Sequence, residues 1–422
     1  MAKVAERSDV TFVAPNRATR RTASTLETIT GASTTGVRTG STKTSYSGLD
    51  GTGIGIAIVD SGVMQAHKAF HTAAGVSRVL KNVQTLTTTQ ADWTNAYSVN
   101  TALQPLVQDS FGHGTHVASV AAGRPATYTV APDLTGIAPN ANIYGVKVLN
   151  NYGFGTLSDT LEGIQWVIYH AKEYNIRVMN LSLVIDSTDN WVVAAAGNFG
   201  KNLSGTENYG SVSSPGNDPS VITVGSANFK AATTRAGAVV NTYSSRGPTR
   251  GGRIDAATGH RLHDNLLKPD LVAPGNAIIG AAATRADAAN ASWNTLAAWF
   301  TSSLVTATGI TPTYRESQMY LSGTSVAAPA VAGTVALLLQ ANPGLTPPMV
   351  KALLQYTAQP MAGANLLQQG AGLLNVNGAV ALAKMLRTDP ASAITAGTIT
   401  AGASFQPIYN WPPCSHPAAA PP

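Results

Sequence analysis

The chain has 422 residues, of which 11% are charged and 44% are hydrophobic, and it contains 40 glycines and 23 prolines. This composition excludes a largely disordered chain and indicates a loop-rich α/β protein. The formal net charge is +6, but the basic residues are scattered apart from Arg17, Arg20 and Arg21, so no nucleic-acid partner is expected.

Short apolar runs predict the strands of a sheet, at residues 54–59, 143–149, 176–183, 191–196 and 221–225. Several of these runs are apolar throughout rather than alternating. This pattern is typical of parallel strands that are covered on both faces.

Helical patterns lie between and after these runs. In 157–174, a spacing of 3, 4 and 3 predicts one buried helical face, made of Leu161, Ile164, Ile168 and Ala171. Further helices are predicted at 114–122, 325–340 and 346–357, the last with Thr346 as N-cap and Pro347 in its first turn. The alternation of strands and helices predicts a three-layer α/β/α fold with a mainly parallel central sheet.

The sequence also bears on whether the chain spans a membrane and on whether it contains a disulfide, a cysteine-based zinc site or a secretory signal. The most apolar segment, Val326 to Leu339, is shorter than the roughly 20 residues of a membrane span and contains Pro329, so we expect a core helix and no membrane partner. Cys414 is the single cysteine, which excludes an intrachain disulfide and a cysteine-based zinc site. The first residues, MAKVAERSDV, show no secretory signal.

Three motifs contain residues suited to nucleophilic catalysis. Asp60 ends an apolar strand in AIVDSGV, at the sheet edge where α/β folds place their sites. His113 stands between two glycines in DSFGHGTHVA, at a predicted helix start, which suits a general base. Ser325 in LSGTSVAAP opens a helix, where unpaired N–H groups and the helix dipole favour an oxyanion.

Each of these residues alone has a commoner structural explanation: a turn for the Asp, a structural role for the His and an N-cap for the Ser. Together, in the chain order Asp, His, Ser, they match a known arrangement of the serine-hydrolase triad. The remaining ordered-region histidines are expected to be structural, namely His67, His71, His116, His170, His260 and His263.

DSGV, GHGTHVA, AAAGN and SGTSVAAP together resemble the subtilisin-like serine proteases, the subtilases (peptidase S8). YSSRGPT at 243–249 and KPDLVAPG at 268–275 support the likeness, which covers about 45 to 385. The resemblance implies that Asp60 orients His113 and that His113 takes the proton of Ser325. It also implies that Asn198 binds the oxyanion beside the backbone N–H of Ser325. The implied function is that of a serine endopeptidase acting through an acyl-enzyme. The related serine-carboxyl peptidases use Glu as the base, and GHGTH argues against that scheme.

The resemblance also implies a substrate cleft in which an extended peptide lies between two edges of the enzyme. The implied edge residues are Gly153, Phe154 and Gly155 on one side and Ser182, Leu183 and Val184 on the other. Val184 stands where the family usually has Gly, so it could crowd the primary pocket. Ser213 is the expected floor of that pocket, Leu157 lines a more distant apolar pocket, and Ser214–Pro215 is expected to be cis.

The expected organisation is a peptidase domain at 45–388 followed by a Pro/Ala-rich tail at 389–422. Residues 1–24 resemble the end of an inhibitory propeptide, although a flexible leader is the alternative. By resemblance, we expect an extracellular monomer whose partners are protein or peptide substrates and its own propeptide. No cofactor or active-site metal is expected; structural Ca²⁺ is common in the family, but no ligand spacing for it is recognisable here.

One stretch departs from the family. About seven residues, 185–191, separate the strand ending in NLSL from the strand ending in AAAGN, where the family has a helix. Fully extended, they span about 23 Å, which is too little for a crossover helix. Either the chain returns between the two strands in a taut, extended connection, or the strand order differs from that of the family. Both outcomes would disturb the position of Asn198. A catalytically weak or inert binding scaffold is therefore the alternative function.

Overall fold

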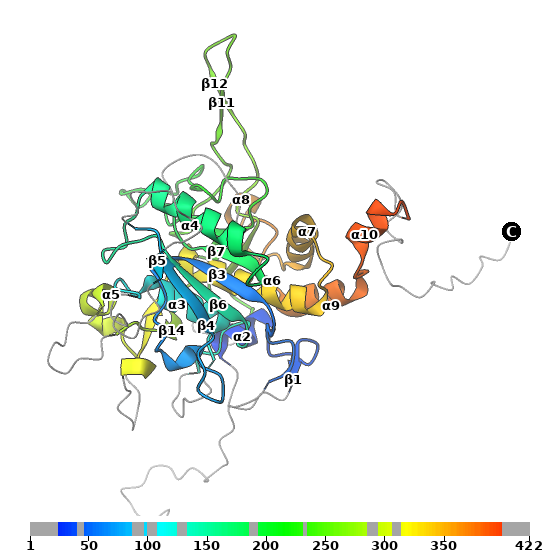
Figure 1. Ribbon diagram of the computed structural model, residues 1–422. Coiled ribbons are helices and arrows are strands. Elements are labelled where there is room, and N and C mark those ends of the chain that lie inside the picture. Colours follow the sequence, from blue (N-terminus) through cyan, green and yellow to red (C-terminus); the bar gives the residue numbers. More distant parts are fainter. Residues whose placement is uncertain are drawn as a thin grey trace, which may run out of the picture.

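The computed structural model describes residues 24–39, 46–86, 97–98, 108–124, 133–184, 193–230, 234–284, 294–305 and 314–398. A nine-stranded sheet forms the centre of this part, with strand order β10-β9-β8-β7-β3-β6-β4-β5 and with β13 paired to β9 (Figure 1). The pairings of β10 with β9 and of β5 with β4 are antiparallel, and the others are parallel. Its strands are β3 (Gly55–Asp60), β4 (Val79–Gln84), β5 (Tyr97–Ser98), β6 (Asn142–Lys147), β7 (Ile176–Leu181), β8 (Val193–Ala195), β9 (Thr223–Asn228), β10 (Val239–Val240) and β13 (Leu271–Pro274).

Among the described residues, three antiparallel pairs lie outside this sheet: β1 (Arg38–Thr39) with β2 (Ser47–Gly48), β11 (Gly252–Ile254) with β12 (Arg261–His263), and β14 (Ile278–Ala281) with β15 (Gln318–Leu321). The β11–β12 hairpin projects from the body of the molecule (Figure 1).

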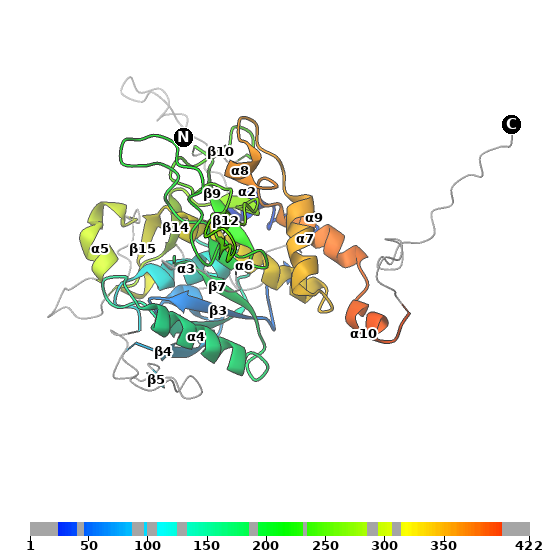
Figure 2. The ribbon, with the colours of Figure 1, turned by 90° about the horizontal axis from the view of Figure 1, so that it is seen from above.

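Helices cover both faces of the sheet. Seen from above, α4 lies on one side of the strands and α3 and α6 lie on the other (Figure 2). The described helices are α2 (Thr25–Thr30), α3 (His113–Ala122), α4 (Leu157–His170), α5 (Thr295–Trp299), α6 (Thr324–Ala341), α7 (Pro347–Thr357), α8 (Leu366–Gln369), α9 (Val376–Met385) and α10 (Pro390–Thr395), with short 3₁₀ turns at η1 (Lys68–Phe70), η2 (Thr301–Ser303) and η3 (Tyr314–Glu316). The predicted three-layer α/β/α fold with a mainly parallel sheet is confirmed.

Strand β3 explains why an unbroken apolar run marks the centre of the fold. Ile56 and Ile58 point into the core that contains the buried residues of α3 and α6. Ala57 and Val59 point into the core that contains Trp166 of α4. All four strand residues are fully buried. Burial on both faces, rather than strand alternation, therefore sets the pattern of this segment.

The predicted inner face of the 157–174 helix is only half right, since Ile164 and Ala171 pack against the core whereas Leu161 and Ile168 do not. Leu161 is 40% exposed and Ile168 is 66% exposed, whereas the buried residues of α4 are Thr160, Gly163, Trp166, Val167 and His170. Gly163 accounts for the rotation, because a Cβ there would lie 2.6 Å from Cγ1 of Val148. The helix approaches the sheet along its glycine, and two large apolar side chains remain on the solvent side.

Helix α6 is long and apolar enough to cross a membrane by composition, but 83% of it is buried inside the protein. Its residues from Val326 to Leu339 are buried, and its apolar residues belong to the main core, as expected for a core helix.

The first described segment packs into the same core. Helix α2 begins with a capping box between Ser24 and Glu27 and buries Leu26. Glu27 also forms an ion pair of 2.5 Å with Arg38, and both side chains are 1% exposed. Packed structure therefore begins upstream of the boundary predicted at about 45. Residues 1–23 and 399–422, which include most of the predicted propeptide remnant and tail, lie outside the described residues.

Strands β7 and β8 are adjacent and parallel, with Asn180 opposite Val193 and Leu181 opposite Ala194. The rest of the connection between them, at 185–192, where either a taut return or a different strand order was expected, lies outside the described residues. The peptide bond between Ser214 and Pro215 is cis, as predicted.

Candidate active site

Asp60, His113 and Ser325 come together at the carboxyl edge of the parallel sheet. Asp60 is the last residue of the central strand β3, His113 is the first residue of α3, and Ser325 is the second residue of α6. Both helices pack on the same face of the sheet (Figure 2). Because the helices begin where the strand ends, residues separated by 53 and 212 positions in the chain become neighbours.

The side chains form a continuous hydrogen-bonded line. His113 Nδ1 lies 2.9 Å from both carboxylate oxygens of Asp60, and His113 Nε2 lies 3.0 Å from Ser325 Oγ. The side chain of Asp60 is fully buried and that of His113 is 15% exposed. This geometry orients one ring nitrogen toward a carboxylate and leaves the other to accept a proton from the hydroxyl.

The surroundings of His113 change its acidity. Burial lowers the pKa of His113, but the charge and hydrogen bond of Asp60, together with the charge of Asp109, outweigh burial and hold that pKa above its usual 6.5. The imidazolium is therefore stabilised in place, which is what a base requires after it has accepted a proton.

Glycine at position 114 allows α3 to begin this close to Asp60. A Cβ on Gly114 would lie 2.1 Å from the carbonyl oxygen of Gly62 and 3.2 Å from Cβ of Asp60. Any other residue would push the start of the helix, and His113 with it, away from the end of the strand. This is a physical reason for the glycine that follows His113 in GHGTH.

Asp109 connects the two loops that carry Asp60 and His113, and sequence reasoning missed it. Its Oδ1 accepts hydrogen bonds from Ser61 Oγ at 2.8 Å and from the N–H of Gly112 at 2.7 Å. Its Oδ2 accepts from the N–H of Thr115 at 2.7 Å and from the Thr115 hydroxyl at 2.5 Å. Burial raises the pKa of Asp109, an effect that these hydrogen bonds only partly oppose. The signal in the sequence was an acidic residue four positions before His113, in the same motif.

Asn198 reaches the start of α6. Its Oδ1 accepts hydrogen bonds from the N–H of Thr324 at 2.9 Å and from the Thr324 hydroxyl at 3.1 Å. A Cβ on Gly323 would lie 2.9 Å from Ser325 Oγ and 3.4 Å from Asn198 Nδ2, so the hydroxyl and the amide nitrogen border the same small space. Within the described residues, neither Asn198 Nδ2 nor the N–H of Ser325 has a hydrogen-bond partner. Two donors are thus available beside the serine hydroxyl.

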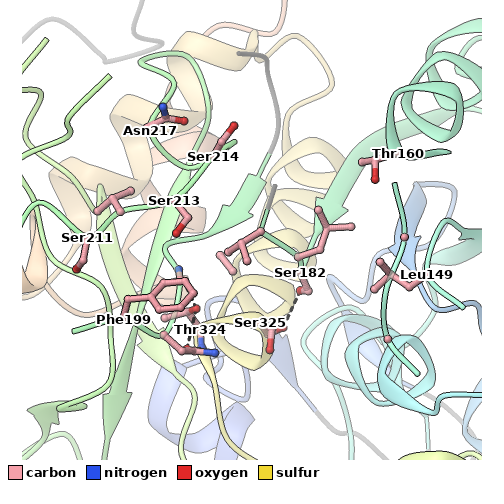
Figure 3. Close-up of a pocket in the computed structure, with 18 of the residues that line it drawn as sticks. Leu149, Thr160, Ser182, Phe199, Ser211, Ser213, Ser214, Asn217, Thr324 and Ser325 are labelled. Atoms are coloured by element: carbon pink, nitrogen blue, oxygen red, sulfur yellow. Dashed lines mark hydrogen bonds between the residues drawn. The ribbon is translucent and has the colours of Figure 1, made fainter. Parts of the chain in front are cut away.

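Ser182 is hydrogen-bonded to Ser325 at the start of α6 (Figure 3). Pro329 is the sixth residue of the helix and so lies beyond the first turn, in which the backbone N–H groups have no intrahelical partner in any case. Proline has no N–H for the carbonyl of Ser325, four residues earlier. Ser182 Oγ donates to that carbonyl instead, at 2.6 Å, and itself accepts from Asn180 Nδ2 at 2.9 Å.

A cleft of about 1220 Å³ opens beside these groups. In Figure 3, Ser213, Ser211 and Phe199 lie on one side of it and Ser182 and Leu149 on the other, with Ser325 between. Every predicted substrate-binding residue lines the cleft: Gly153, Phe154, Gly155, Leu157, Ser182, Leu183, Val184 and Ser213. His113, Asn198 and Ser325 line it as well, whereas Asp60 lies buried behind them. Val184 is 43% exposed at the rim.

Other lining residues were not anticipated, including Phe111, Phe199, Asn217 and Arg250. Phe111 packs against Gly153, where a Cβ would lie 2.6 Å from its ring, and Trp299 meets Phe111 edge-on with ring centroids 6.4 Å apart. These contacts join segments that are far apart in the sequence, so no local sequence pattern predicted them.

Two other histidines are buried and hydrogen-bonded to backbone carbonyls. His67 Nε2 lies 2.8 Å from the oxygen of Ser317, and His116 Nε2 lies 3.1 Å from that of Ile278. Burial lowers the pKa of His67 to about 4 and that of His116 to about 3, so both stay neutral. Across the described ranges, no group of three or more His, Cys, Asp or Glu side chains is placed to hold a metal ion.

Comparison with known proteins identifies the family. A sequence model of the subtilase family matches residues 51–378. The serine protease AprX of Bacillus subtilis is 32% identical over 307 residues, which cover 67% of this chain and 60% of AprX. Subtilisin DY of Bacillus licheniformis is 28% identical over 351 residues, which cover 80% of this chain and 94% of that protein. The chain therefore belongs to the subtilase family.

A solved structure agrees with this assignment. A cold adapted subtilisin-like serine proteinase aligns with a TM-score of 0.50 and 25% identity, over 78% of this chain and 90% of that one. The chain thus spans nearly the whole of this structure, but less than two thirds of AprX.

Proposed function

We propose that the protein is a serine endopeptidase that hydrolyses peptide bonds through an Asp60–His113–Ser325 triad. The observation that carries the proposal is the line of hydrogen bonds from the buried carboxylate through the imidazole to the hydroxyl, at 2.9 and 3.0 Å. Its position in a large open cleft gives a polypeptide access to Ser325.

The proposed reaction begins when Ser325 Oγ attacks the carbonyl carbon of the substrate and His113 Nε2 takes the hydroxyl proton. Asp60 accepts the Nδ1–H hydrogen bond, so it fixes the ring tautomer and stabilises the imidazolium. His113 then gives the proton to the leaving amine, which leaves an acyl group on Ser325. Water, deprotonated by His113, releases the acid product and restores the hydroxyl.

Negative charge develops on the carbonyl oxygen during both attacks. Asn198 Nδ2 and the N–H of Ser325 are the proposed donors to it, because both are unpaired in the described structure and border the hydroxyl. Thr324 holds Asn198 by its oxygen, so the amide nitrogen is turned away from Thr324 and is fixed before the substrate arrives. A donor that needs no reorganisation stabilises the transition state more than a mobile one.

The proposed substrate is an extended peptide that lies between residues 153–155 and 182–184. We further propose that the protein is an extracellular monomer and that its own propeptide binds in the cleft. The proposed reaction needs no cofactor, since the catalytic groups in every step above are side chains or backbone groups of the chain. Similarity to AprX and to bacterial subtilisins supports the peptidase assignment.

The test combines active-site labelling with proteolysis. A fluorophosphonate probe should label the full chain at Ser325, and the protein should digest casein; both signals should vanish in Ser325→Ala. Ser322→Ala provides a matched control, because Ser322 lies three residues away and its hydroxyl accepts only from the N–H of Ala277 among the described contacts. Absence of labelling in a folded wild-type sample would refute the proposal.

A further inference from the structure

One end of the cleft is polar and carries a single cationic side chain. Ser211, Ser213 and Asn217 lie together on one side of the cavity, as Figure 3 shows. Arg250 also lines the cavity and is exposed. It lies two residues before β11, the first strand of the β11–β12 hairpin. Apart from His113, it is the only titratable residue in the described lining, and that lining contains no aspartate or glutamate.

The position of Arg250 is defined by its packing on Gly210. A Cβ on Gly210 would lie 2.2 Å from Arg250 Nε and 3.0 Å from Cζ, so the guanidinium rests directly on the glycine backbone. Gly210 begins the segment that leads to Ser211 and Ser213, and its N–H bonds to the carbonyl of Gly247. The absence of a side chain at position 210 therefore leaves the space that the guanidinium occupies.

The guanidinium of Arg250 has no ion pair or hydrogen bond among the described residues. The carboxylates of the neighbouring segments have other partners. Glu207 pairs with Arg246 at 2.6 Å, and Asp264 Oδ1 accepts from the Thr249 hydroxyl at 2.5 Å. Asp218 Oδ1 accepts from the N–H of Ser220 at 2.7 Å. An arginine without a partner, beside hydroxyl and amide groups, has the donors that a carboxylate needs.

This polar end lies next to the reacting groups. A Cβ on Gly197 would lie 3.0 Å from Ser213 Oγ, and Gly197 directly precedes Asn198. The side chain of a substrate residue whose carbonyl is held at Asn198 would therefore extend toward Ser213. The pocket for the residue that precedes the scissile bond is thus bordered by Ser213, and Arg250 lines the same cleft, packed on Gly210 three residues before Ser213.

We propose that Arg250 is a specificity-determining residue, and that the enzyme prefers substrates with glutamate or aspartate immediately before the cleaved bond. This inference rests on the proposed function, because it names the substrate class of that same cleft. The guanidinium would donate to the side-chain carboxylate, while Ser213 and Asn217 would offer further donors. A neutral side chain of equal size would leave the guanidinium with only water as its partner.

Paired peptides that differ only in Glu or Gln before the scissile bond test the proposal. For the full chain, kcat/KM should be about tenfold higher for the Glu peptide, as expected for one charge-assisted hydrogen bond in a partly solvated site. Arg250→Gln should bring the ratio to about one, and Arg250→Glu should bring it below one. Because the interaction is ionic and open to solvent, the wild-type ratio should also fall as salt is added.

Arg177→Gln is the matched control, since Arg177 is an exposed arginine of β7 outside the cleft lining and the variant loses the same charge. It should leave the Glu/Gln ratio unchanged. A wild-type ratio at or below one, or a ratio that Arg250→Gln does not alter, would overturn the proposal.

A binding measurement separates this inference from the proposed function. Product peptides ending in Glu or Gln can be titrated into the Ser325→Ala variant, which cannot turn over. A Kd about tenfold lower for the Glu peptide, lost in the Ser325→Ala/Arg250→Gln double variant, supports the carboxylate pocket even if the wild type cleaves nothing. Equal Kd values for the two peptides refute it even if the wild type is an active peptidase.

Discussion

Replacement of Asn198 by alanine tests the proposed oxyanion site directly. The change removes the Nδ2 donor beside Ser325 Oγ and also removes the oxygen that accepts from Thr324. In this family, loss of the oxyanion Asn is known to lower turnover by about 100- to 1000-fold, equivalent to about 2.7–4 kcal/mol of transition-state stabilisation. We expect a loss of that size in kcat with little change in KM, because the donor acts on charge that exists only in the transition state.

The same change should have a much smaller effect on folding. Asn198 accepts two hydrogen bonds from Thr324, at 2.9 and 3.1 Å, and a hydrogen bond of this kind contributes about 0.5–1.5 kcal/mol to the free energy of unfolding. Asn198 is exposed, so water can replace its oxygen and the cost should lie at the low end, about 1 kcal/mol. Urea unfolding should therefore show a stable protein whose kcat has fallen.

Two further variants make the assay specific. Asn198→Asp keeps an acceptor for Thr324 but replaces the donor by a negative charge, so kcat on a chromogenic peptide should fall at least as far while stability is retained. Asn151→Ala removes an exposed asparagine outside the cleft lining and should change neither quantity. If Asn198→Ala keeps kcat within about threefold of wild type while Ser325→Ala is inactive, the proposed role of Asn198 is wrong.

Two other predictions concern pH and packing. Because His113 must be neutral to act as a base and its pKa is raised above 6.5, kcat/KM should fall as the pH drops through that raised value; Asp60→Asn should move the midpoint down, and an unmoved midpoint would contradict the assignment. The contribution of His113 to the free energy of unfolding depends on pH in the opposite direction to kcat/KM. Because the pKa of His113 is raised in the folded state, this contribution is fully present below the pKa of the unfolded chain and is lost as the pH rises through the pKa of the folded protein. On α4, Val167→Ala should lower the free energy of unfolding by about 2 kcal/mol, whereas Ile168→Ala should change it by less than about 0.5 kcal/mol in urea titrations; equal effects would mean that the buried face is misplaced.

The class of the fold followed from local pattern. The apolar runs at 54–59 and 191–196 predicted parallel strands, and the observed strands β3 (Gly55–Asp60) and β8 (Val193–Ala195) agree with them within two residues at each end. The sequence patterns succeeded because a strand covered on both faces must be apolar at every position, as the fully buried Ile56 and Ala57 show. That requirement applies residue by residue, so it can be read without knowing the partner strands.

The buried face of α4 shows where local pattern failed. Leu161 and Ile168 have the spacing of an inward face, yet they point to solvent because Gly163 lets the helix approach Val148 closely. Hydrophobic spacing identifies the helix, but its rotation depends on which side allows the closest packing with the sheet. The sheet surface is assembled from strands distant in the chain, so the sequence of the helix does not contain that information.

The sequence by itself determined the proposed reactive groups: Asp60, His113, Ser325 and Asn198 each lie in a short motif whose local geometry, a strand end or a helix start, suits the chemistry proposed for it. Only the tertiary structure decided how they are held. Asp109 ties the loops of Asp60 and His113 together, Ser182 supplies the hydrogen bond that Pro329 cannot give, and Arg250 reaches the cleft from the base of a projecting hairpin. These partners are set by long-range packing at the edge where parallel strands end, and no local sequence pattern specifies which distant side chains meet there.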